Sequence, residues 1–117
     1  MTFDQVETYI LSDGLDDWVM LGAVAEAAVA FGYGASTLAV RPQVLRAIDA
    51  LLSKRLIYLG EVPKDGKFHQ WEGSSEHLLQ RLEQLLAVDD ENTWYASAWV
   101  DLTELGTSVA SALDSSY

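Results

Sequence analysis

The feature that most constrains the fold is an apolar stretch over residues 18–31, in which Glu26 is the only charged side chain. A helix that is apolar nearly all round belongs in the interior, so this stretch predicts a helix at the centre of the domain. The stretch is 14 residues long, whereas a membrane-spanning helix needs about 20. We therefore expect a core helix rather than an export signal or a membrane anchor.

The rest of the chain predicts further helices and a few short strands around this helix. Asp16 and Asp17 stand where carboxylates favour the start of the central helix. Apolar spacing and capping residues predict helices over residues 2–11, 18–31, 42–55, 75–86 and 103–113. Residues 56–62 and 67–71 predict a β-hairpin, and 93–101 predicts one more strand. At 117 residues, the chain is expected to form a single α+β domain, 1–117, that is mostly helical.

Charge is the strongest property of the composition. The chain has 18 acidic and 7 basic residues, for a net charge of −11. Such a surface repels nucleic acids and anionic lipid and attracts basic proteins, although solubility alone would also account for it. Six of the seven cations fall within residues 41–67, which hold only three acids. This positive window is either a functional face or a set of groups that pair internally with the surrounding acids.

No residue pattern indicates catalysis. The absence of cysteine excludes disulfides, thiolate metal sites and cysteine nucleophiles, and it fits a cytoplasmic location. The two histidines, His69 and His77, lack the spacing of a zinc motif, and no serine-nucleophile elbow or phosphate-binding loop is present. We therefore expect a protein that is not an enzyme and has no cofactor and no metal.

Acidic residues beside aromatic ones mark the surface that we expect to bind a partner. The acidic residues 89–91 come just before Trp94 and Tyr95. In a strand these two side chains would point to opposite faces, so at least one would be exposed, as in a protein-binding hot spot. Packing in the core is the alternative for each. The predicted partner-binding residues are Asp13, Asp16, Asp17, Asp89, Asp90, Glu91, Trp94 and Tyr95.

The helix-then-hairpin segment resembles bacterial winged-helix proteins. The sequence VLRAIDALLSKRLI over residues 44–57 resembles their recognition helix and first wing strand. DGKF over 65–68 looks like a wing tip, and LTELG over 102–106 is similar to the Leu-Thr-x-x-Gly that opens the helix after the wing. The chain departs from the family's pattern between its second and third helices, where about nine residues replace a turn of three or four.

This resemblance implies a winged-helix variant that binds DNA as a homodimer, acting as a transcriptional regulator. It would place a recognition helix over residues 42–54. The DNA contacts that it implies are Gln43, Arg46 and Lys54 on the helix and Lys64 and Lys67 on the wing.

A second resemblance concerns size, charge and layout. The chain resembles small acidic bacterial proteins, some of which serve as immunity proteins for secreted toxins. This likeness implies a binding protein that neutralises or sequesters a basic protein partner, such as a toxin domain. We take this as the leading hypothesis for function, and DNA binding as the alternative.

Overall fold

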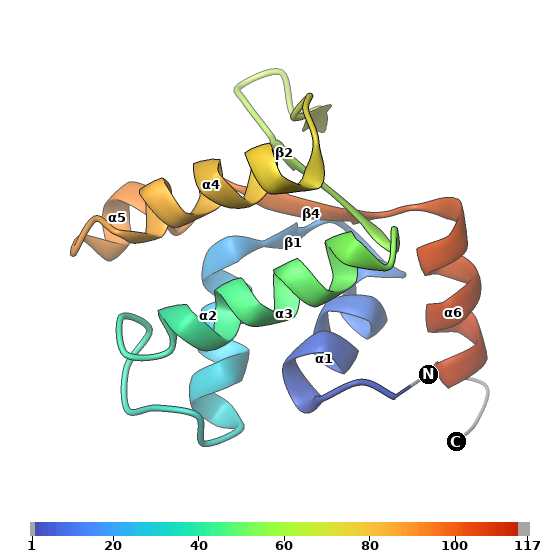
Figure 1. Ribbon diagram of the computed structural model, residues 1–117, viewed down its shortest axis with the longest axis horizontal. Coiled ribbons are helices and arrows are strands. Elements are labelled where there is room, and N and C mark those ends of the chain that lie inside the picture. The colour runs from blue at the N-terminus through green and yellow to red at the C-terminus, as the bar shows by residue number, and fades with distance from the viewer. Residues whose placement is uncertain (1, 115–117) are drawn as a thin grey trace.

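A four-stranded antiparallel sheet organises the domain in the computed structural model, which describes residues 2–114 (Figure 1). The strand order is β1-β4-β2-β3. The two central strands pair over four residues each, with Leu59 opposite Val100. The strands are β1 (Val19–Met20), β2 (Ile57–Glu61), β3 (His69–Gln70) and β4 (Trp99–Leu102).

Helices pack around this sheet and supply most of the core. Helix α2 packs against α1, α3 and the short α5 on its buried side, whereas Glu26 and Ala30 are exposed, so the expected helix is present but is not buried all round. Its side chains Leu21, Val24, Ala25 and Ala28 are fully buried. The helices of the described chain are α1 (Gln5–Gly14), α2 (Leu21–Ala30), α3 (Arg41–Ser53), α4 (Ser75–Leu86), α5 (Glu91–Trp94) and α6 (Glu104–Asp114).

Side-chain caps fix where α1, α4 and α6 begin, as Asp90 does for the short α5. The Ser74 hydroxyl accepts a hydrogen bond from the His77 amide, 3.2 Å away. The Thr103 hydroxyl accepts one from the Gly106 amide at 2.9 Å, as its place before the last helix predicts. Helix α1 begins later than the expected Thr2, because Asp4 caps it instead.

A residue with a left-handed backbone follows the end of helix α3. Arg55 has a φ of 59°. Its amide donates to the Leu52 carbonyl, and the Leu56 amide donates to the Leu51 carbonyl, both at 3.0 Å. This pair of bonds is a Schellman motif, in which glycine usually holds the left-handed position. The motif turns the chain directly into β2.

The expected α+β class and the hairpin of β2 and β3 are confirmed, and two local predictions are wrong. Residues 19–20 form β1 rather than the first turn of the central helix, because β4 pairs with them. Residues 93–101 are not one strand: Asp90 caps the helical turn α5, and only 99–102 are extended. None of the helices between residues 2 and 114 has the length and hydropathy that a membrane crossing requires.

Candidate functional site

The acidic loop, residues 87–90, joins α4 to α5, and its carboxylates have structural partners. Asp89 forms an ion pair of 2.9 Å with Arg41 at the start of α3. Asp90 accepts hydrogen bonds from the Asn92 amide at 3.0 Å and the Thr93 hydroxyl at 3.2 Å, which cap α5. Two of the predicted partner-binding acids therefore also hold this end of the molecule together.

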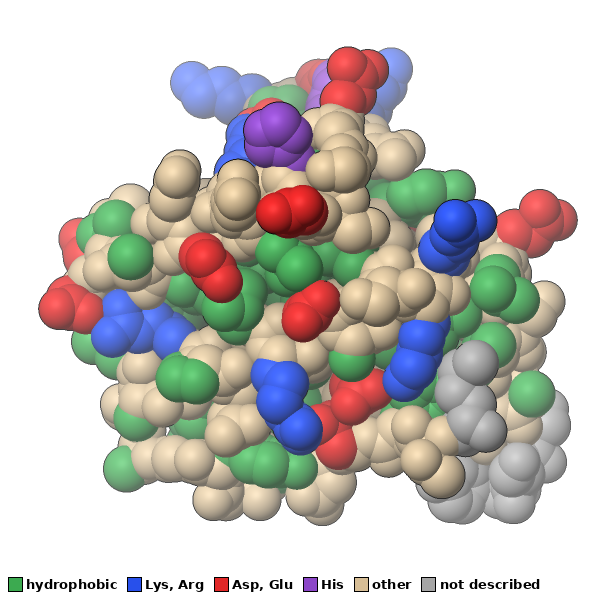
Figure 2. All heavy atoms as spheres, in the orientation of Figure 1, with side chains coloured by type: hydrophobic (Ala, Val, Ile, Leu, Met, Phe, Trp, Pro, Cys, Tyr) green, Lys and Arg blue, Asp and Glu red, His purple; other side chains and the backbone are tan. Residues whose placement is uncertain are grey.

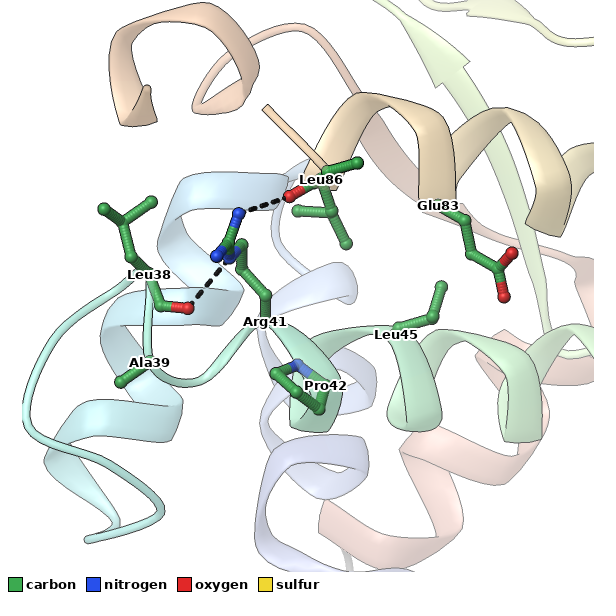
Figure 3. A pocket seen from close by; sticks show the side chains of 8 residues that line it. Leu38, Ala39, Arg41, Pro42, Leu45, Glu83 and Leu86 are labelled. Atoms are coloured by element: carbon green, nitrogen blue, oxygen red, sulfur yellow. Dashed lines mark hydrogen bonds between the residues drawn. The ribbon is translucent and has the colours of Figure 1, made fainter. Parts of the chain in front are cut away.

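Arg41 acts as a clamp between α3 and α4 (Figure 3). Its Nε donates to the Leu38 carbonyl at 2.9 Å, and its Nη1 donates to the Leu86 carbonyl at 2.7 Å. Cations favour the C-terminal end of a helix, where carbonyl groups lack intrahelical partners. The guanidinium of Arg41 thus caps α4. Nothing local in the sequence marks this role, because Leu86 lies 45 residues away.

Trp94 cannot contact a partner, which corrects its assignment as a partner-binding residue. Its side chain is 0% exposed. The prediction assumed a strand, but residues 91–94 form a helical turn that packs against α2 and α4. Tyr95 stacks on the Trp94 ring with centroids 6.5 Å apart, and it is half-buried.

Tyr95 belongs to a group that we call the tyrosine–carboxylate face: Tyr9, Asp13, Glu26, Glu91 and Tyr95. Burial, followed by a hydrogen bond to Glu26, raises the pKa of Tyr95 to about 12. Burial, followed by a hydrogen bond to Asp13, raises the pKa of Tyr9 to about 12 as well. The charge of Glu26 contributes to both shifts, so this one carboxylate of α2 acts on the tyrosine of α1 and on that of α5.

Glu91 is the member of the face that α5 contributes beside Tyr95. Its carboxylate accepts a hydrogen bond from the Thr37 hydroxyl, which ties α5 to the connection before α3. Its charge also contributes to the raised pKa of Tyr95. Asp13, Glu91 and Tyr95 were predicted as partner-binding residues, whereas Tyr9 and Glu26 were missed. The signal for Glu26 was its position as the only charge in the apolar stretch.

Asp16 and Asp17 are exposed in the turn between α1 and β1. Asp17 accepts a hydrogen bond of 2.8 Å from the Trp18 amide. Both remain accessible to a partner, but neither takes part in the interactions that join the two tyrosines.

The tyrosine–carboxylate face combines groups that suit a cation. Its carboxylates accept charge-assisted hydrogen bonds from guanidinium or ammonium groups. The tyrosines are neutral at physiological pH, as tyrosine is at its ordinary pKa of about 10, and their rings offer cation–π contacts. No group of histidine, cysteine or acidic residues within 2–114 has the arrangement of a metal site.

Three of the six cations in the positive window pair with acids of the same chain. Arg46 lies 2.7 Å from Asp4, and Lys54 lies 3.8 Å from Glu7 and 4.9 Å above the Phe3 ring. With the pair formed by Arg41, half of the six cations have carboxylate partners. Figure 2 shows the result: blue and red side chains alternate over this face, with no continuous basic stripe.

The other residues of the DNA-binding alternative lie apart from these pairs. Gln43 is half-buried on α3, and Lys64 and Lys67 are exposed in the hairpin turn. His69 in the same hairpin lies 2.7 Å from Asp65. The Lys67 amide, and then His69, lower the pKa of Asp65. The chain matches no protein-family model, no curated protein and no solved structure.

Proposed function

We propose that this domain is a non-enzymatic binding protein that neutralises a basic protein partner, most concretely an immunity protein or inhibitor of a bacterial toxin in the cytoplasm. The observation that carries the proposal is the packing of α2 against α1 and α5, which brings Tyr9 and Tyr95 near the same carboxylate, that of Glu26, in the tyrosine–carboxylate face. The internal pairing of Arg41, Arg46 and Lys54 supports it, because the charges left unpaired are mostly acidic.

The proposed mechanism has two steps. The net charge of −11 steers a basic partner toward the domain, and a lysine or arginine of that partner then docks on the tyrosine–carboxylate face. The bound domain covers the basic cleft of the partner and blocks its substrate. Such steering raises the association rate and weakens as ionic strength rises.

The experiment that tests this proposal is capture of the partner by the tagged domain from its host's lysate, at low and moderate salt, with bound protein and DNA both identified. We expect one basic protein in stoichiometric amount. The paired change Asp13→Asn and Glu26→Gln should weaken its binding by about tenfold or more, as hot-spot contacts do. The matched control, Glu72→Gln with Glu76→Gln, removes the same charge from exposed residues on the hairpin side of α4.

Two results would contradict the proposal. An acidic or uncharged partner would remove the electrostatic mechanism. Equal weakening by the two double variants would show that net charge matters and that the tyrosine–carboxylate face does not.

A winged-helix regulator is the second candidate, because Lys64 and Lys67 are exposed in the hairpin that follows α3. The packing of α4 against α3 disfavours it (Figure 1). The major groove of B-DNA is about 12 Å wide and admits one helix. Because α4 packs beside α3, the pair of helices is too wide for α3 to enter the groove. If the domain does bind an operator in this way, Arg46→Ala and Lys54→Ala should abolish binding without unfolding it. Tight binding that survives both changes would exclude α3 as the recognition helix.

A further inference from the structure

A groove of about 530 Å³ runs between the start of α3 and the end of α4 (Figure 3). Its floor is apolar, formed by Leu38, Pro42, Leu45 and Leu86. Grooves of this kind lose water readily when an apolar side chain enters, which is the main source of binding energy at such surfaces. The groove lies beside the acidic loop, since Arg41 contacts both Leu86 at its edge and Asp89 in the loop.

The two charged residues that line the groove differ in what they can offer a ligand. Arg41 is held by the Leu38 and Leu86 carbonyls and by Asp89, so its charge is satisfied within the chain. Glu83 projects from α4 on the side of the groove near Leu45, as Figure 3 shows. Within residues 2–114, no side chain pairs with its carboxylate. The free charge of the groove is therefore negative.

The shape of the groove suits a helix. Pro42 and Leu45 lie three residues apart on α3, and Glu83 and Leu86 lie three apart on α4, so each wall repeats at about one helical turn. Ala39 and Ala87 at the edges are small and allow a close approach. A third helix can pack its ridge of side chains into a groove formed by two others.

We propose that this groove binds a basic amphipathic helix of the partner protein. Aliphatic side chains of that helix would cover Leu45 and Leu86, and a lysine or arginine would pair with Glu83. This inference rests on the proposed function and adds a second contact, on the α3 side of the acidic loop, to the tyrosine–carboxylate face. The helix-in-groove mode gives affinity through the apolar anchors and orientation through the charge.

The test uses three synthetic peptides of equal length and the full ¹⁵N-labelled chain. One peptide places leucines and lysines so that a helix is amphipathic, the second has the same composition in a non-amphipathic order, and the third replaces lysine with glutamate. We expect the first peptide to bind tightest and to shift the amides of Leu38, Leu45 and Leu86. Leu45→Asp should weaken it by about tenfold or more, and Glu83→Gln by about threefold at low salt. Leu105→Asp, an exposed leucine in a different cavity, is the matched control.

Equal binding of the two leucine–lysine peptides would overturn the inference, as would shifts centred on Tyr9 and Tyr95. The amide spectrum of the Leu45→Asp variant without peptide shows whether the variant is folded. Leu45→Ser provides a milder change at the same site. If only the groove inference is wrong, the tagged domain still captures a basic partner, and Leu45→Asp does not change that capture. Failure of the proposed function shows instead as the capture of no basic protein.

Discussion

Replacing Gly22 with alanine should destabilise this protein, although alanine is the better helix former. Gly22 is the second residue of α2, and the Tyr95 ring lies directly on its Cα. A Cβ at this position would lie 2.2 Å from the ring, where ordinary contacts are 3.4–4 Å. The ring would therefore have to move, losing its hydrogen bond to Glu26 and its stacking on Trp94.

The expected size follows from two opposing terms. Alanine in place of glycine favours a helix by about 0.5–1 kcal/mol. Overpacking costs about 1–3 kcal/mol, and the lost hydrogen bond to a carboxylate adds about 1 kcal/mol or more. The net loss for Gly22→Ala is thus about 1–3 kcal/mol, or roughly 4–12 °C in Tm for a domain of this size.

A double-mutant cycle measured by urea denaturation checks this reasoning. Tyr95→Ala removes the ring, so in that background Gly22→Ala should be neutral or stabilising. The coupling energy between the two changes should then be about 2–3 kcal/mol. If Gly22→Ala stabilises the unmodified protein, or if the two changes are additive, Tyr95 does not lie on α2 and the tyrosine–carboxylate face is wrong.

Three further predictions concern stability. Trp94→Ala should cost about 3–5 kcal/mol in urea denaturation because the ring is fully buried, and a loss below about 1 kcal/mol would place it on the surface after all. Arg55→Gly should stabilise the protein by about 1 kcal/mol, since glycine adopts a positive φ without strain; a lower Tm would contradict this. Burial, and then Asp4, raise the pKa of Glu7, so the folded state binds the proton more tightly than the unfolded state. Stability should therefore rise, relative to Glu7→Gln, as pH falls from 7 toward 4.5; parallel pH profiles of the two proteins would refute it.

The sequence predicted those parts of the fold that local patterns specify. The helices α3, α4 and α6 have apolar side chains at helical spacing and a capping or N-terminal residue, such as Ser74 or Thr103, at the expected place. Strand β1 could not be predicted, because two residues in an apolar stretch become extended only through pairing with β4. The same holds for α5. Its residues fit the alternation of a strand, but Asp90 caps them as a single helical turn.

The site was predicted only in part, for a related reason. Asp13, Glu91 and Tyr95 stood out because acidic residues lie near aromatic ones along the chain. Tyr9 and Glu26 come near these residues only when α1, α2 and α5 pack together, and no local sequence pattern predicts that packing. The positive window was conspicuous in the sequence, yet half of its cations find carboxylates from distant segments.

The position of β4 in the sheet has a consequence for synthesis on the ribosome. Strands β1 and β2 each pair with β4 and not with each other, and β4 is the last strand within residues 2–114. A nascent chain that ends before residue 99 can form the β2–β3 hairpin but leaves both partners of β4 unpaired. Non-local pairing of this kind closes late and slows folding. The sheet should therefore close only once β4 has been made, and fragments lacking β4 and α6 should be prone to aggregation and proteolysis.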